Sequence, residues 1–317
     1  MSQSDSMFQP IRSELSVPGG DLRKIQKALA SDADAVFLDL EDSVAPGQKE
    51  AARQVVIDAV TTLDWSRPAP AVRINAVGSS WCYRDLVGIV EHAGARLAKV
   101  VVPKVRSAGD IHFIDRLLTQ VEQHVGRSEP IQIEVQIEDA AGLLAIREIA
   151  AASDRIRELT FGQGDFAASV GMPANDIGIG DEWDNAVDGD RWLFARQTIV
   201  FGARAAGVRA LNGPYAAYQR GAGFRGYCLM SRALGFDGVW CIHPNQIAIA
   251  NEVFTPSAQE IARARATVDA MEGAWASGQG AASRDSVMVD EASLRMAHSV
   301  LAMAERIERR QTKTDEA

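Results

Sequence analysis

The sequence predicts an α/β fold, a TIM-type (β/α)₈ barrel with a C-terminal helical extension, and three observations support this prediction. Short β-branched, apolar runs alternate with longer stretches of helical periodicity along most of the chain. About eight such units occur in one series, which is the number of strands in a closed barrel. The runs at 35–40 and 99–105 are apolar at consecutive positions, as expected for strands that are buried on both faces.

Each expected strand is short and is followed by a helical pattern or a turn. The strands are predicted at residues 14–17, 35–40, 71–75, 99–105, 131–138, 158–162, 208–213 and 238–244. The first helix is predicted after Gly20, with Asp21 as its N-cap and with Leu22, Ile25 and Leu29 on one face. Further helical patterns cover residues 48–60, 110–125, 141–153 and 192–207.

Three regions are predicted along the chain. Residues 1–10 are polar and form a loose tail, residues 11–255 form the catalytic barrel, and residues 256–317 form the helical extension. In the extension, helical patterns at 258–274 and 291–310 flank a linker of small residues at 275–286. An appendage of about 60 residues is too small to fold well alone, so it must pack on the barrel or on a neighbouring subunit.

One stretch inside the barrel region lacks a period. Residues 172–192 are rich in Asp and Gly, and we expect a solvated loop that covers the site at the barrel end. Its acidic residues do not have the spacing of an EF-hand, so a calcium loop is not expected.

Composition restricts the class of protein. The 317 residues are 47% hydrophobic, which allows a large core, and the net charge of -9 argues against binding a nucleic-acid backbone. The chain has no apolar run of about 18 residues and no apolar signal core at its start, so neither a membrane span nor secretion is expected. Three cysteines without a CxxC pair argue against a disulfide framework. A cytoplasmic protein is therefore expected.

Charged residues recur where the apolar strands end. Five successive strands carry them: Glu41 and Asp42, Arg73, Lys104, Glu138, and Asp165. Burying a charge without a partner or a metal costs several kcal/mol, so five successive cases indicate one shared polar site. In a barrel, the carboxyl ends of the strands are where the chemistry takes place.

Glu138 and Asp165 are the first candidates for metal ligands. They end neighbouring strands, so both carboxylates can point at one spot on the barrel axis. Two carboxylates with room for water and a substrate oxygen suit Mg²⁺, which keeps several ligands that do not come from the protein. The spacing leaves open that Asp165 only caps the next turn and that Glu138 only pairs with a surface arginine.

Arg73 is the candidate for substrate binding. An unpaired guanidinium inside an apolar strand is costly, and its fork suits a carboxylate or an enolate oxygen. A structural salt bridge to Glu41 or Asp42 is the alternative, and it is compatible with a substrate-binding role because such an acid can hold the arginine in place.

Two further residues are less specific candidates. Asp290 precedes the last helix, where it is either an N-cap or an acid-base group that the extension delivers. His243, at the end of the last strand, is expected to shape the barrel mouth or to bond backbone there. The sequence has no zinc-type His/Cys spacing, no serine-nucleophile motif and no GxGxxG after a strand.

Longer segments match one known pattern. They are RSELSVPGG, DADAVFLDLEDSVAPGQKEAAR, VRINAVGSSW, VVPKV, FGQGD, ALGFDGVWCIHPNQIAIANEVFTPS and MVDEASLRMA. With these segments, from about Arg12 to Arg309, the sequence resembles the citrate lyase β-subunit-like branch of the HpcH/HpaI aldolase superfamily. The resemblance implies a modified TIM barrel, a homo-oligomer such as a trimer or hexamer, Mg²⁺ or Mn²⁺ as cofactor, and a CoA thioester as substrate.

Within that branch, the sequence is most similar to malyl-CoA, β-methylmalyl-CoA and citramalyl-CoA lyases. These enzymes cleave a 3-hydroxyacyl-CoA that carries a carboxylate into an acyl-CoA and a 2-oxoacid such as glyoxylate or pyruvate. The resemblance implies that Glu138 and Asp165 are metal ligands, that Arg73 contacts the oxoacid and the thioester enolate, and that Asp290 reaches the active site of an adjacent subunit. A further set of charged groups is expected around this centre, with the two acids ordering water on the metal: Glu41, Asp42 and Lys104.

The sequence departs from the family pattern at three places. Glu14 and Ser16 stand where relatives have apolar or aromatic residues, IEDAAGL surrounds Glu138, and Ser286 and Val287 replace a Gly-Lys pair that bears on CoA binding. Three other functions stay open: a malyl-CoA thioesterase, a citrate lyase β subunit that works on an acyl-carrier partner, and a non-catalytic acyl-CoA-binding protein.

Overall fold

Eight parallel strands form a closed barrel, which confirms the predicted fold class. The structure, a computed structural model, describes residues 10–187 and 189–315, so the tail predicted at residues 1–10 lies almost entirely outside the described residues. The described chain folds as two compact units, Ile11–Asn251 and the residues from Glu252 onward. The domain boundary predicted after residue 255 lies four residues beyond this division and stays a prediction.

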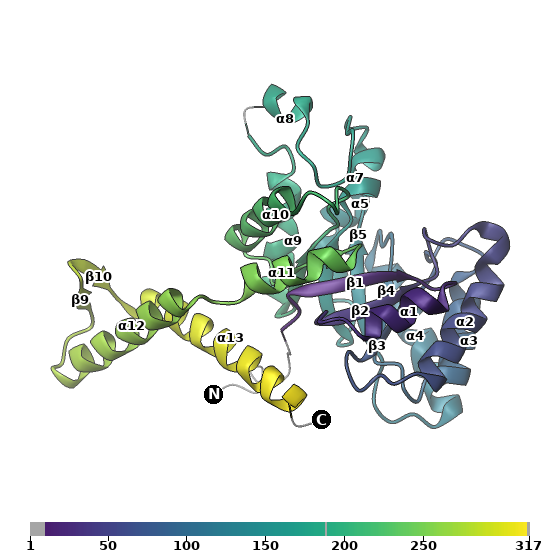
Figure 1. The fold of residues 1–317 in the computed structure, drawn as a ribbon, viewed down its shortest axis with the longest axis horizontal. Coiled ribbons are helices and arrows are strands. Elements are labelled where there is room, and N and C mark those ends of the chain that lie inside the picture. The colour runs from purple at the N-terminus through teal and green to yellow at the C-terminus, as the bar shows by residue number, and fades with distance from the viewer. Residues whose placement is uncertain (1–9, 188, 316–317) are drawn as a thin grey trace. The chain divides into compact units, whose positions relative to one another are not determined.

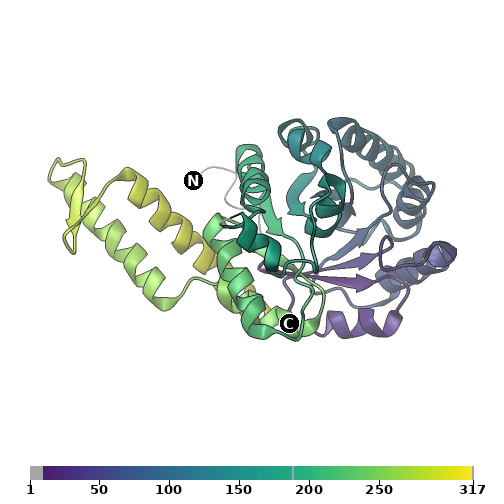
Figure 2. The same ribbon diagram turned by 90° about the horizontal axis from the view of Figure 1, so that it is seen from above.

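All eight barrel strands lie where the sequence predicted them, and each pairs with its neighbours in chain order (Figures 1 and 2). The strand β1 also pairs with β8, which closes the barrel. Their bounds are β1 Ser13–Pro18, β2 Ala35–Asp39, β3 Pro70–Arg73, β4 Lys99–Val102, β5 Gln132–Ile137, β6 Ile156–Phe161, β7 Arg209–Asn212 and β8 Gly238–Cys241.

Helices follow the strands in the order that a barrel requires. They are α1 Leu22–Leu29, α2 Lys49–Thr62, α3 Cys82–Ala93, α4 Ala108–Val125, α5 Ala140–Leu144, α6 Ile146–Ala150, α7 Gln163–Val170, α8 Glu182–Ala186, α9 Leu193–Ala206, α10 Gly221–Leu234 and α11 Ile247–Phe254. Asp21 caps α1, since its side chain accepts a hydrogen bond from the backbone of Lys24 at 3.1 Å. The helix predicted at 141–153 is divided at Ala145 into α5 and α6.

The stretch predicted as a solvated loop at 172–192 is more ordered than expected. It contains the short helix α8, whose N-cap Asp181 forms a capping box with Asp184. Arg191 donates from Nη2 to both carboxylate oxygens of Asp181 at 2.9 Å and from Nη1 to the carbonyl of Pro173 at 2.6 Å, so it ties the end of this stretch to its middle and its start.

A buried ionic cluster fills the amino-terminal part of the barrel interior. Lys99 on β4 contacts Glu14 on β1 at 2.7 Å and Glu134 on β5 at 2.5 Å. Glu158 on β6 pairs with Arg209 on β7, and all three glutamates are fully buried. Glu14 therefore belongs to a buried polar network of the barrel interior.

Apolar side chains form the next layer toward the carboxyl end of the barrel. Phe37, Ala71, Val101 and Trp240, from four different strands, form one buried cluster. The Phe37 and Trp240 rings meet edge to face, with centroids 5.3 Å apart. Because successive side chains of a strand alternate between faces, this cluster identifies the positions that point inward.

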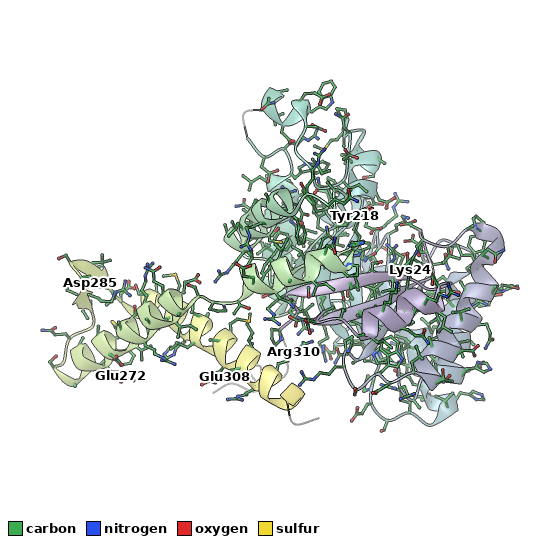
Figure 3. All side chains as sticks on the ribbon, viewed as in Figure 1. Lys24, Tyr218, Glu272, Asp285, Glu308 and Arg310 are labelled. Carbon is green, nitrogen blue, oxygen red and sulfur yellow. The ribbon has the colours of Figure 1, made fainter. Side chains whose placement is uncertain are left out.

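The second unit consists of two long helices and a small hairpin. The helices α12 Ala258–Ala276 and α13 Glu291–Asp315 confirm the two predicted helical patterns. The last part of the predicted linker instead forms one strand and the turn of a hairpin, with β9 Ala282–Arg284 and β10 Val287–Val289. This hairpin packs through Val289 against Met271 and Leu294. Asp285 lies at its tip (Figure 3). No helix within 10–187 or 189–315 is long and apolar enough to cross a membrane.

Candidate active site

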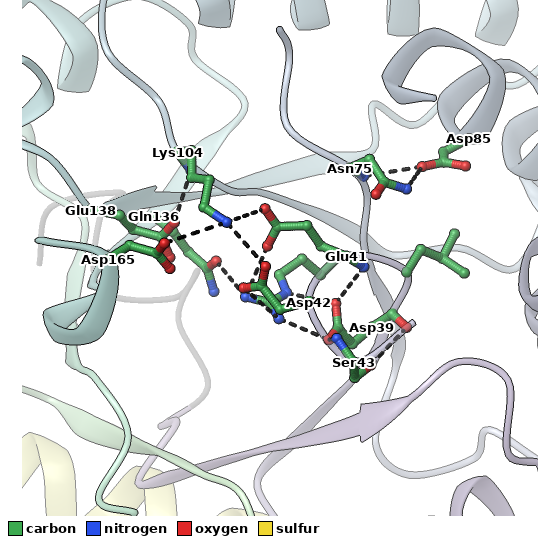
Figure 4. A network of polar contacts seen from close by, with 12 residues as sticks. Asp39, Glu41, Asp42, Ser43, Asn75, Asp85, Lys104, Gln136, Glu138 and Asp165 are labelled. Carbon is green, nitrogen blue, oxygen red and sulfur yellow. Dashed lines mark hydrogen bonds and ion pairs between the residues drawn. The ribbon is translucent and has the colours of Figure 1, made fainter. Parts of the chain in front are cut away.

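Charged side chains from five consecutive strands meet at the carboxyl end of the barrel. The structure brings together six of the predicted residues in one polar network (Figure 4), from β2, β3, β4, β5 and β6 and the turns that follow them. They are Glu41, Asp42, Arg73, Lys104, Glu138 and Asp165. The polar site expected from the strand ends is therefore present.

Arg73 is held from several sides at the last position of β3. Its main partner is Asp39, with Nε 2.7 Å from Oδ1 and Nη2 2.8 Å from Oδ2. The guanidinium also lies over the ring of Trp240, 5.0 Å from the centroid, and donates from Nη1 to Gln136 Oε1 at 3.3 Å. Burial would lower the pKa of Arg73, but the hydrogen bonds and charge of Asp39 outweigh it and raise that pKa.

Asp39 is a residue of the candidate site that the sequence did not predict. It ends β2 and is 1% exposed. Besides Arg73, its two carboxylate oxygens accept the backbone N–H groups of Glu41 and Ser43 at 2.8 and 3.1 Å. Asp39 thus fixes the catalytic arginine candidate and the loop that carries Glu41 and Asp42. The salt bridges expected from Arg73 to Glu41 and Asp42 are present but longer, at 3.3 and 3.7 Å.

Lys104, which follows β4, contacts residues after β2, β5 and β6 through its backbone N–H and its ammonium group. Its backbone N–H donates to Glu138 Oε2 at 3.2 Å. Its ammonium contacts Glu41 at 2.7 Å, Asp42 at 3.1 Å and Asp165 at 3.6 Å. The residue has a φ of 52°, a left-handed conformation that costs a non-glycine residue about 1–3 kcal/mol.

Glu138 and Asp165, the predicted metal ligands, both belong to this network, and their role as ligands stays a prediction. Glu138 is buried, and a Cβ on Gly162 would stand 2.3 Å from its Cγ, so the glycine leaves the space that this carboxylate occupies. Burial first, and then the nearby charges of Glu41 and Asp165, raise the pKa of Glu138 to about 8. Asp165 stands in the first turn of α7, half exposed.

The donor set fits a hard divalent cation. Five carboxylates face two cationic side chains in this network, which leaves three formal negative charges: Asp39, Glu41, Asp42, Glu138 and Asp165 against Arg73 and Lys104. Within the described ranges, no group of three or more His, Cys, Asp or Glu side chains is arranged to enclose a metal ion. Two carboxylates with open positions beside them are typical of Mg²⁺, which retains non-protein ligands.

Asp290 belongs to the second unit, where it caps α13. Its Oδ1 accepts the backbone N–H of Ser293 at 3.0 Å, and that bond is the main reason why the pKa of Asp290 is lowered. The N-cap interpretation is thus confirmed, and the acid-base role stays a prediction. Ser286 and Asp285 form the turn of the hairpin, and both have positive φ.

The remaining predicted features take ordinary roles. His243 Nδ1 accepts the backbone N–H of Asn245 at 3.2 Å and caps the short helix η3 Pro244–Gln246, as expected for a residue that shapes the barrel mouth. Its ring stacks on Tyr218, with centroids 4.5 Å apart. The three cysteines are free and buried.

Comparisons with known proteins agree with this architecture and identify the family. The model of the HpcH/HpaI aldolase/citrate lyase family matches residues 12–244. An L-malyl-CoA/β-methylmalyl-CoA lyase of Cereibacter sphaeroides is 42% identical over 310 residues, which are 94% of this chain and 96% of the relative. A (3S)-malyl-CoA thioesterase of the same species is 34% identical over 94% of this chain and 96% of the relative. The crystal structure of protein CitE from Mycobacterium tuberculosis with magnesium, acetoacetate and coenzyme A has a TM-score of 0.75 and 30% identity, covering 94% of this chain and 99% of that one.

Proposed function

The chain belongs to the HpcH/HpaI aldolase/citrate lyase family, and from that premise we propose that it is a metal-dependent acyl-CoA lyase. The proposed reaction cleaves malyl-, β-methylmalyl- or citramalyl-CoA into an acyl-CoA and a 2-oxoacid such as glyoxylate or pyruvate, or condenses the two. The observation that supports it most is the combination of a rigidly held Arg73 with two neighbouring metal-type carboxylates at one barrel end. The 42% identical lyase over nearly the whole chain supports the same reaction class.

The charge that develops during the cleavage determines what the residues must do. Breaking the carbon–carbon bond leaves an enolate on the acyl-CoA half and a new carbonyl on the oxoacid half. Glu138 and Asp165 would hold Mg²⁺ or Mn²⁺, and the cation would supply Lewis-acid stabilisation to the hydroxyl oxygen that becomes the carbonyl. Arg73 offers its Nη1 edge to the enolate oxygen, and because Asp39 fixes the guanidinium, the donor is preorganised.

Other charged groups support these two roles. Lys104 keeps Glu41 and Asp42 close to the centre, where the acids can order water around the cation. Asp290, delivered by an adjacent subunit, moves the proton at the acyl-CoA α-carbon. This last role requires a homo-oligomer, trimeric or hexameric, and light scattering of the purified protein tests it because a monomer would exclude the delivery.

Substitution of one ligand tests the proposal. Asp165→Asn should abolish Mg²⁺-dependent turnover while the circular dichroism spectrum and melting temperature stay close to those of the wild type. The matched control is Asp176→Asn, at an exposed position of the loop after α7. Normal turnover in Asp165→Asn would refute the metal assignment.

A thioesterase is the second candidate, and the 34% identical (3S)-malyl-CoA thioesterase favours it. It would use the same site, but water would hydrolyse the thioester and the carbon–carbon bond would stay intact. Product analysis separates the two: a lyase releases glyoxylate and acetyl-CoA from malyl-CoA, whereas a thioesterase releases malate and free CoA.

A further inference from the structure

The mouth of the barrel is divided into a charged sector and an uncharged sector. The strands β2 to β6 carry every ionisable group of the network described above. The remaining three strands, β7, β8 and β1, are neighbours because β8 pairs with both β7 and β1. At the carboxyl ends of these three strands, and directly after β7 and β8, the residues are uncharged: Leu211 and Gly213, Trp240 and Ile242, and Ser16 and Pro18.

The strand register supports this assignment of faces. In-register partners in a parallel sheet share a face, and residues two apart along one strand also share it. Trp240 points inward because it packs with Phe37 and lies against Arg73. Ile242 follows it by two positions, and its main chain N–H bonds the side chain of Gln246 at 2.8 Å.

Ser16 is the neighbour of Ile242 across the strand pair. Leu15 and Cys241 are the last pair of the two strands, and Ser16 and Ile242 are the residues that directly follow them. Ser16 also pairs with Phe37, an interior residue, which puts its side chain on the inner face. Ser16 is half-buried and Ile242 is 39% exposed, so both reach the open end of the barrel.

Arg73 stands at the border of the two sectors. Its guanidinium lies over Trp240, the base of the uncharged sector, while Nη1 faces Gln136 and Glu41 in the charged sector. A substrate whose reacting bond lies at Arg73 therefore has one end among carboxylates and cation and the other end against apolar side chains. The carboxylated half belongs in the first sector, and the acyl group of the thioester belongs in the second.

We propose that Ile242 and Ser16 form the wall against which the acyl group packs, and that they determine which substituent on the acyl α-carbon is accepted. This inference rests on the proposed lyase function, and it names the residues that determine which substrate the lyase prefers. A methyl group that is buried against an apolar wall gains about 0.8 kcal/mol, and pockets discriminate one methylene by roughly 10–200-fold in kcat/KM. The small Ser16 beside Ile242 leaves room for such a group.

The test measures the ratio of kcat/KM for β-methylmalyl-CoA to that for malyl-CoA, which differ by one methyl group at this carbon. Ser16→Val should lower the ratio by about 10-fold because the added methyl groups fill the space, and Ile242→Ala should raise it by about 5-fold because the wall recedes. Ser16→Thr and Ile242→Val are milder changes at the same positions and should shift the ratio in the same directions. The control is Val125→Ala at the end of α4, where the side chain is similarly exposed at 38%.

The outcomes separate the two proposals. Opposite shifts of the ratio at residues 16 and 242, with none in Val125→Ala, support the acyl wall. A wild type that cleaves both substrates, with all four variants at the wild-type ratio within about twofold, overturns the wall and leaves the lyase function standing. A wild type that cleaves neither substrate overturns the lyase proposal for these substrates and the wall with it.

Discussion

Arg73 and Asp39 form a bidentate ion pair inside the barrel, with Nε–Oδ1 and Nη2–Oδ2 distances of 2.7 and 2.8 Å. The pair joins β3 to β2 at the level of the candidate active site and uses two of the three guanidinium nitrogens. Only Nη1 is turned toward Gln136 and Glu41. The direction in which Arg73 can stabilise negative charge is therefore set by Asp39.

The first prediction concerns this pair. Asp39→Asn should lower kcat by about 100-fold, because a misplaced catalytic donor costs that much even when binding persists. KM for the CoA thioester should change little. The matched control is Asp34→Asn, since Asp34 forms an equivalent buried pair with Arg12 at 2.7 and 2.9 Å, at the start of β1 and β2.

Steady-state kinetics and thermal unfolding of the two variants give the answer. Both should lose stability, of the order of 3 kcal/mol, because each leaves a buried arginine with a neutral partner. Only Asp39→Asn should lose kcat. Equal kcat values in the two variants would show that Asp39 is merely structural.

The second prediction concerns the left-handed backbone of Lys104. Lys104→Gly and Lys104→Met both remove the ammonium, but only glycine adopts a φ of 52° without strain. The glycine variant should be more stable than the methionine variant by about 1 kcal/mol in chemical denaturation.

The exposed Lys27 in the last turn of α1 provides the control, because glycine is unfavourable in a helix. There the order should reverse, with Lys27→Gly less stable than Lys27→Met by about 1 kcal/mol. The same order at both positions would argue that the conformation of Lys104 carries no strain.

The third prediction is a pH dependence from Glu14. Burial, and then the charge of Glu134, raise the pKa of Glu14 well above its ordinary value in the folded state. The native state therefore holds a proton that the unfolded state releases, so this residue's contribution to stability is present below the unfolded pKa and is lost as the pH rises through the folded pKa.

Glu14→Gln replaces the titrating carboxyl with a neutral amide, so the variant should lose less stability than the wild type as the pH rises. The free energy of unfolding of Glu14→Gln relative to the wild type should increase as the pH is raised from about 4.5 upward. Glu272→Gln, at an exposed position of α12, serves as the control and should show no such trend. A constant difference between Glu14→Gln and the wild type at all pH values would contradict the protonated state.

The fourth prediction concerns metal binding. A cation that binds only the folded protein raises its stability, by about 2.7 kcal/mol at a concentration 100 times its Kd. The wild type should be stabilised by Mg²⁺ in this way, and Glu138→Gln should not, whereas Glu129→Gln at an exposed position should respond like the wild type. Because the pKa of Glu138 is about 8, affinity for the cation should rise as the pH approaches that value from below. Thermal unfolding with and without MgCl₂ measures the stabilisation, and calorimetric titration at several pH values measures the affinity. Equal binding by Glu138→Gln would remove this residue from the ligand set.

The barrel could be predicted from sequence because its strands carry strong local signals. The runs at 35–40 and 99–105 are too apolar for a strand with a solvated face, and the charge that follows each run marks the same end of the sheet. The convergence of Glu138, Asp165 and Arg73 then follows from topology alone, since parallel strands end on one side.

The features that were missed depend on contacts between distant residues. Asp39 lies inside the apolar run VFLDL, and only the structure shows that it is paired with Arg73 from the next strand. The β9–β10 hairpin has short strands and a turn of Asp285 and Ser286 in place of glycine, so it resembles a linker until Val289 is seen to pack on α12. The hydrogen bond from Lys99 to Glu14 joins β1 to β4 across the barrel interior, beyond the reach of any local pattern.

The central claim is carbon–carbon bond cleavage at the Arg73, Glu138 and Asp165 site, and the most direct test follows both products of one substrate over time. Purified protein with Mg²⁺ is mixed with malyl-, β-methylmalyl- or citramalyl-CoA, and mass spectrometry quantifies 2-oxoacid, acyl-CoA, free hydroxyacid and free CoA. The account predicts equal amounts of 2-oxoacid and acyl-CoA from at least one substrate, with both lost on addition of EDTA. Free hydroxyacid and CoA in equal amounts, without any 2-oxoacid, would contradict it and identify a thioesterase.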